Sequence, residues 1–146
     1  MKKTSLLIIS LLLIITALSA QTKVANYAIG KHGTDKYEHF EFWVKDGKRT
    51  EIVYSYGKED KNVKLQYAGR DLVNGDPCFK VSFPNNYSLF IVAKGAQLLI
   101  RDNEGQYNKN FSWQYEGPVN GIGTYCDVCA EDEQDAVNLI KSTYLK

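Results

Sequence analysis

The chain has 146 residues, of which 12% are aromatic, with ten Tyr, and 24% are charged. Eighteen Lys and Arg against 17 Asp and Glu give a formal net charge of +1. Because acidic and basic residues are interspersed and no basic block occurs in the sequence, nucleic acid and anionic membrane surfaces are not expected as partners. The length suits one domain with a hydrophobic core of its own.

The first twenty residues have the pattern of a secretory signal peptide. Lys2 and Lys3 precede an uncharged run rich in Leu and Ile at 4–15, and small residues follow up to Ala20. The apolar run is too short for a relaxed transmembrane helix, which needs about 20 residues. We therefore expect cleavage after Ala20. Residues 21–146 would then form a single exported domain, periplasmic or extracellular, without a membrane anchor.

Most of the remaining chain alternates apolar and polar residues with a period of two, which is typical of strands with one buried face. About eight short strands are expected, at 24–29, 39–44, 51–56, 63–67, 78–83, 87–94, 98–100 and 107–115. Asp46-Gly47 lies between two of these runs and indicates a hairpin, because a type I′ turn needs positive φ at both central residues. The segment 69–77 is expected to be a loop.

The end of the chain changes to a helical period. Within 130–145, four apolar residues recur at spacings of three and four, namely Ala136, Val137, Ile140 and Tyr144. No helical pattern separates the strands, which favours an antiparallel meander. The predicted fold class is therefore mainly β: a meander of about eight strands, as a small barrel or a strongly curled sheet, with a C-terminal amphipathic α-helix that docks on the sheet or plugs one end.

A glycine-rich segment, 117–129, joins the last strand to the helix and ends in a Cys-x-x-Cys pair, Cys126 and Cys129. We expect a local disulfide between these two, with Cys78 as a reduced thiol, although Cys78 could instead bridge to either. A helix N-terminus also favours the thiolate, so the pair could be active in thiol–disulfide exchange. A zinc site completed by His32 and His39 is a weaker alternative, and neither a metal nor another cofactor is expected.

No catalytic constellation is apparent in the sequence. The motifs of α/β-hydrolases, phosphate loops, zinc proteases and calcium loops are missing. Carboxylate pairs occur, for example Glu38 with Glu41 and Glu59 with Asp60, and they are expected on solvated faces. No residue is therefore predicted to be catalytic, which favours a binding protein over an enzyme.

The aromatic-rich meander predicts a non-enzymatic domain that binds a small apolar ligand or a protein partner through its barrel mouth or loops, with an inhibitor as one form of such a protein. Asn120, Tyr125, Trp113 and Tyr115 are the binding candidates, in or beside the glycine-rich segment. The alternative function is an exported thiol–disulfide active protein that uses the Cys126/Cys129 pair.

Tyr67-Ala68-Gly69, followed by the apolar run 87–95, resembles small periplasmic barrel inhibitors of lysozyme. The resemblance covers these two segments and assigns no role to any residue. The Gly-x-Trp signature of lipocalins is missing from the first strand, so membership of that family is not expected.

Overall fold

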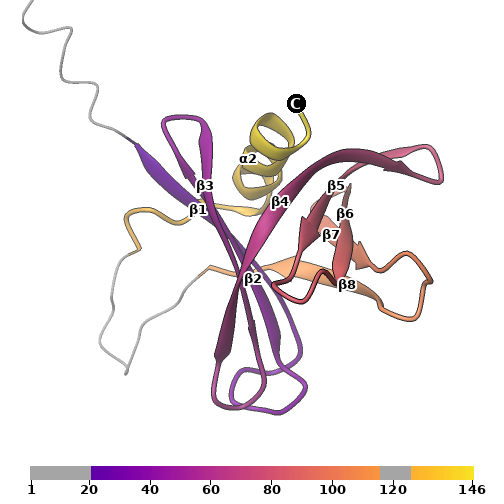
Figure 1. Ribbon diagram of the computed structural model, residues 1–146. Helices are drawn as coiled ribbons and strands as arrows, with labels where there is room; N and C mark the ends of the chain where they lie inside the picture. Colours follow the sequence, from indigo (N-terminus) through magenta and orange to yellow (C-terminus); the bar gives the residue numbers. More distant parts are fainter. Residues whose placement is uncertain (1–20, 116–125) are drawn as a thin grey trace, which may run out of the picture.

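A computed structural model describes residues 21–115 and 126–146 and shows a closed, eight-stranded antiparallel barrel with a helix at one end (Figure 1). The predicted mainly-β meander is confirmed, and its strands pair in chain order, with β8 returning to β1. The strands are β1 (Thr22–Ile29), β2 (Glu38–Lys45), β3 (Lys48–Tyr56), β4 (Lys61–Val73), β5 (Asp76–Ser82), β6 (Ser88–Lys94), β7 (Gln97–Arg101) and β8 (Asn108–Trp113). The expected signal peptide at 1–20 lies outside the described residues.

Turn chemistry accounts for the hairpins. Asp46 and Gly47 have φ of 53° and 70°, as a type I′ turn requires, and the predicted hairpin between β2 and β3 is confirmed. The prediction of a loop at 69–77 is wrong, because β4 continues to Val73 and β5 begins at Asp76. Asn74-Gly75 makes the tight turn of this extended hairpin. Both of its faces carry exposed side chains, such as Leu72 at 65% exposure, so the sequence shows no alternation there.

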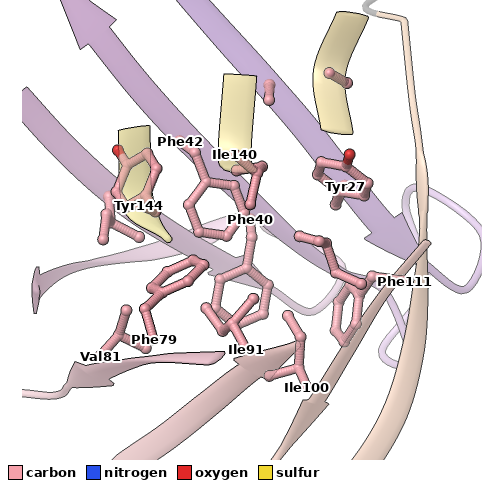
Figure 2. Packing of buried hydrophobic residues seen from close by; sticks show 14 of the residues in the cluster. Tyr27, Phe40, Phe42, Phe79, Val81, Ile91, Ile100, Phe111, Ile140 and Tyr144 are labelled. Carbon is pink, nitrogen blue, oxygen red and sulfur yellow. The ribbon is translucent and has the colours of Figure 1, made fainter. Parts of the chain in front are cut away.

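The barrel interior is filled by aromatic and aliphatic side chains (Figure 2). Phe40 and Phe42 on β2 point inward, and Phe111 and Phe79 meet them edge to face, with ring centroids 5.1 and 5.8 Å apart, respectively. Such edge-to-face geometry adds to the gain from burying the rings. The core is therefore a packed set of rings.

Helix α2 (Glu133–Tyr144) covers one end of the barrel (Figure 1). It begins three residues later than predicted, because Asp132 is the N-cap and accepts a hydrogen bond from the backbone amide of Asp135 at 2.7 Å. Its buried face includes Ile140 and Tyr144, and the Tyr144 hydroxyl donates to the backbone carbonyl of Trp43 at 3.0 Å. Since Trp43 lies near the end of β2, the start of β2 lies at the opposite end of the barrel, which we call the far end. No helix in the described ranges is long and apolar enough to span a membrane.

Candidate functional site

The predicted local disulfide is confirmed. Cys126 and Cys129 form a disulfide, and Cys78 on β5 is a buried thiol. Burial raises the pKa of the Cys78 thiol, and nearby Asp71 raises it further. A buried, protonated thiol is a poor nucleophile, so Cys78 acts as a small core residue.

The disulfide lies at the seam where the barrel closes. Strands β1 and β8 pair only at Tyr27 with Trp113 and at Ala28 with Ser112. Nearer its start, β1 is bonded instead by the disulfide segment, 126–130. The amide of Val24 donates to the carbonyl of Val128 at 2.7 Å, and the amide of Ala130 donates to the carbonyl of Val24 at 2.9 Å.

This segment therefore forms hydrogen bonds with the part of the β1 edge that β8 leaves free. The buried amide nitrogen of Asn26 also donates to Cys129 Sγ at 3.6 Å. The disulfide pins the short segment that seals the seam and leads into α2, and this geometry gives it a structural role.

The zinc alternative is wrong. Both thiols of the pair are consumed by the disulfide, and no group of three potential ligands occurs among the residues that the structure describes. His32 Nε2 lies 2.9 Å from Asp60 Oδ2 instead. His39 is buried, and this burial lowers its pKa against the opposing charges of Glu41 and Asp60.

The structure describes two of the four predicted binding residues. Trp113, at the end of β8, is partly buried against the core, and Tyr115 beyond it is exposed, with the ring centroids 6.3 Å apart. Both lie next to the seam. Asn120 and Tyr125 lie outside the described residues.

A row of aromatic side chains reaches the surface at the far end. Tyr54 lies 4.8 Å from the core ring of Phe40, and the rings of Tyr56 and Phe83 each lie 5.5 Å from Tyr54, measured between centroids. Phe83 in turn lies 5.6 Å from Tyr87. Tyr56 and Tyr87 are each 41% exposed. The far end therefore presents two tyrosines that are supported by the core beneath them.

A cluster of polar groups centred on Glu38 lies beside this row. The Glu38 carboxylate accepts hydrogen bonds from the hydroxyls of Tyr54, at 2.9 Å, and of Tyr107, and it pairs with the Lys109 ammonium. The expectation that Glu38 is solvated is wrong, because its side chain is only 12% exposed. Glu38 shares the inward phase of Phe40 in β2, which places it inside the barrel rim. Burial, together with the Glu38 charge, raises the pKa of both tyrosines.

Beside this cluster, Asp102 organises the loop between β7 and β8. Its Oδ2 accepts hydrogen bonds from the amide of Tyr107 at 3.1 Å and the hydroxyl of Tyr87 at 3.3 Å. Burial raises the pKa of this carboxyl, but the backbone amides, that of Tyr107 foremost, and the Tyr87 hydroxyl outweigh burial and hold the pKa below its usual range. Asp102 is therefore an ionised carboxylate.

Asp102 also borders a surface hollow of about 490 Å³. Aromatic, amide, hydroxyl and carboxylate side chains line it: Asn86, Tyr87, Ser88, Asp102, Asn103, Glu104, Gln106 and Tyr107. The hollow and the exposed tyrosines together form the candidate functional site.

Sequence reasoning did not identify this site. Tyr107 and Phe111 share the apolar phase of the last predicted strand, but Asp102 stands in a polar turn that resembles any solvated loop. Three separate parts of the chain supply Tyr56, Tyr87 and Tyr107. Only the closed barrel brings together the strand ends at which these residues lie.

Comparison of the chain with known protein families, with characterised proteins and with solved structures gave no match. Any function must therefore be inferred from the fold and its surface.

Proposed function

We propose that this chain is an exported, non-enzymatic domain that binds a protein partner through the far end of its barrel. One observation carries the proposal: the aromatic row that begins at the core ring of Phe40 ends in two exposed tyrosines, Tyr56 and Tyr87. Tyrosine is enriched among the residues that dominate binding energy at protein interfaces.

The packing of the barrel favours a protein partner over a small apolar ligand. A ligand held inside the barrel would need the volume that fully buried residues such as Tyr27, Phe40, Phe79 and Phe111 occupy (Figure 2). Interiors are close-packed, and opening one for a ligand means displacing such side chains. Binding on the surface requires no such change.

The two tyrosines are also held in place before binding. Tyr56 is stacked on Tyr54, and the Tyr87 hydroxyl is bonded to Asp102. Side chains that are already ordered lose less conformational entropy when they bind. An inhibitor that blocks a partner's active site is one form of such a protein.

Export rests on two observations. The N-terminal sequence has the signal-peptide pattern, and a disulfide such as Cys126–Cys129 is compatible with an oxidising compartment.

Site-specific photo-cross-linking in the cell that makes the protein tests the proposed surface. A benzophenone amino acid would replace Tyr56 or Tyr87, and the control would replace Ser142, which is exposed on α2 at the other end. We expect the same partner protein to be captured from both tyrosine positions and not from Ser142. Capture of that partner from Ser142 alone would contradict the proposal.

The thiol-active alternative has one observation in its favour. Cys126 is partly exposed while Cys129 is buried, so an external thiolate could approach only the first sulfur. Rapid exchange of the native disulfide with reduced glutathione would support this function, and resistance to exchange would exclude it.

A further inference from the structure

Both histidines of the chain, His32 and His39, meet in one cluster at the far end. His32 lies between β1 and β2, and His39 lies near the start of β2. Both imidazole rings contact the Tyr37 ring, with their centroids 5.0 and 6.1 Å from it, respectively. Histidine is the side chain whose ordinary pKa, about 6.5, lies closest to neutral pH. The cluster therefore gathers the groups of this protein that are best suited to sense mild acid.

The histidine cluster lies where two connections of the barrel meet. The loop 30–37, between β1 and β2, and the turn 57–60, between β3 and β4, lie side by side at the bottom of the barrel in Figure 1. The amide of Gly57 in the turn donates to the carbonyl of Tyr37 in the loop at 2.8 Å. This turn directly follows Tyr56, one of the two exposed tyrosines of the candidate functional site. The contact between loop and turn therefore also holds the backbone beside Tyr56.

His39 is buried where a strand side chain would usually meet solvent. It alternates with the inward-pointing Phe40, which places it on the outer face of β2, yet it is only 8% exposed. The residues opposite it on the neighbouring strands, Ala28 on β1 and Ser55 on β3, are uncharged. A charged imidazole in this position would lose most of its hydration, which is costly.

Three charged or titratable groups face His39 within the described ranges. Its Nδ1 lies 3.9 Å from Glu41 Oε1 on its own strand, and Asp60 and His32 act on it from the turn and the loop. Burial lowers the pKa of His39, and this effect outweighs the two carboxylates, which raise it, while His32 adds to the lowering. The pair between His32 and Asp60 also joins loop and turn, at 2.9 Å, but its side chains are 71% and 44% exposed. Because such exposed pairs contribute little to stability, the buried His39 dominates the response to acid.

We propose that protonation of His39 in mild acid releases the loop 30–37 from the turn 57–60 and so loosens the partner-binding surface at Tyr56. In the closed form, loop and turn are bonded; in the open form, His39 is hydrated and binds its proton more tightly. The closed form is therefore fully stable above about pH 6.5 and loses stability as the pH falls below that value. The inference rests on the proposed function and adds its regulation: the partner is held at neutral pH and released in acid.

Amide hydrogen exchange, followed by nuclear magnetic resonance at about pH 7.5 and about pH 5, tests the opening without the partner. In acid, the protection factor of the Gly57 amide should fall at least about fivefold. The fall should not exceed about thirtyfold, the limit for one proton with a pKa of about 6.5 in the open form. The Ala130 amide, which donates to the carbonyl of Val24 at 2.9 Å near the start of β1, is the control and should keep its protection factor. Constant protection of Gly57, or an equal fall at Ala130, would overturn the inference.

Two matched variants assign the opening to one histidine. His39→Gln keeps a polar side chain that cannot take up a proton, and it should abolish the pH dependence at Gly57. His32→Gln should retain this dependence, and its loss there but not in His39→Gln would refute the role of His39. If His39→Gln does not fold, the wild type decides: the titration midpoint of the His39 imidazole should lie below about 6.5, and a midpoint at or above this value would refute the inference.

The partner identified by cross-linking separates the regulation from the proposed function. Its affinity should fall at least about threefold between about pH 7.5 and about pH 5 for the wild type, because only the closed form binds well, but not for His39→Gln. An equal fall for both proteins would place the pH dependence elsewhere and refute the regulation. Capture from Tyr56 and Tyr87 with an affinity that does not change with pH would leave the proposed function standing and refute the regulation. Acid-induced opening at Gly57 without capture of any partner would support the opening and contradict the proposed function.

Discussion

Replacement of both Cys126 and Cys129 by Ser should lower the free energy of unfolding by about 2 kcal/mol. The disulfide closes a loop of only four residues, and the loop-closure entropy for that length corresponds to about 2 kcal/mol at 25 °C. The backbone bonds between Val24 and the disulfide segment do not involve sulfur. They should therefore persist in the variant, and the loss should stay near the entropic value.

Urea denaturation of the wild type and the double variant measures this loss, provided that the slope with denaturant is unchanged. Wild-type protein reduced with dithiothreitol serves as the control and should lose the same stability. No measurable loss would show that the disulfide does not restrict the unfolded chain. A loss of about 5 kcal/mol or more would show that the whole segment leaves the seam. It would refute the claim that the backbone hydrogen bonds of this segment persist without the disulfide.

Three other predictions concern the helix, the partly buried tyrosines Tyr54 and Tyr107, and export. Ile140→Asp buries an unpaired carboxylate under α2 and should cost several kcal/mol, whereas the exposed Lys141→Asp should be mild; equal melting temperatures would refute the assigned helix face. Because the pKa values of Tyr54 and Tyr107 are raised in the folded state, the unfolded chain loses these protons first as the pH rises above about 10. Stability should therefore fall with pH in that range, and urea midpoints that stay constant between about pH 9 and about pH 11 would contradict it. The intact mass of the exported protein should correspond to a chain that begins at Gln21, and a mass that retains the first twenty residues would exclude the expected cleavage.

The fold could be predicted because its signals are local. The inward phase of Phe40 and Phe42 identifies a strand, Asp46-Gly47 identifies its hairpin, and the spacing of Ile140 and Tyr144 identifies the face of the helix. The pairing of Cys126 with Cys129 was also predictable, because two cysteines only three positions apart meet more readily than either meets the distant Cys78.

The far end could not be predicted because it is assembled by closure of the barrel. Glu38 appeared to be one of two solvated acids, but it shares the inward phase of Phe40 and meets Lys109, which is 71 residues away in the chain. The position of Asp102 depends on how the loop before β8 folds back over it, and no periodic pattern encodes that. Side chains on both faces of the extended β4–β5 hairpin are exposed, which removed the alternation that would have identified it.

Calorimetric titration with the partner identified by cross-linking tests the proposed function most directly. The test protein carries Tyr56→Ser and Tyr87→Ser. The control carries Leu72→Ser, which removes an even more exposed large apolar side chain from the β4–β5 hairpin. If the far end is the interface, the double variant should weaken binding at least about thirtyfold, since hot-spot residues contribute about 2 kcal/mol or more, and the Leu72 variant should bind like the wild type. Unchanged affinity of the double variant would contradict the proposed binding surface.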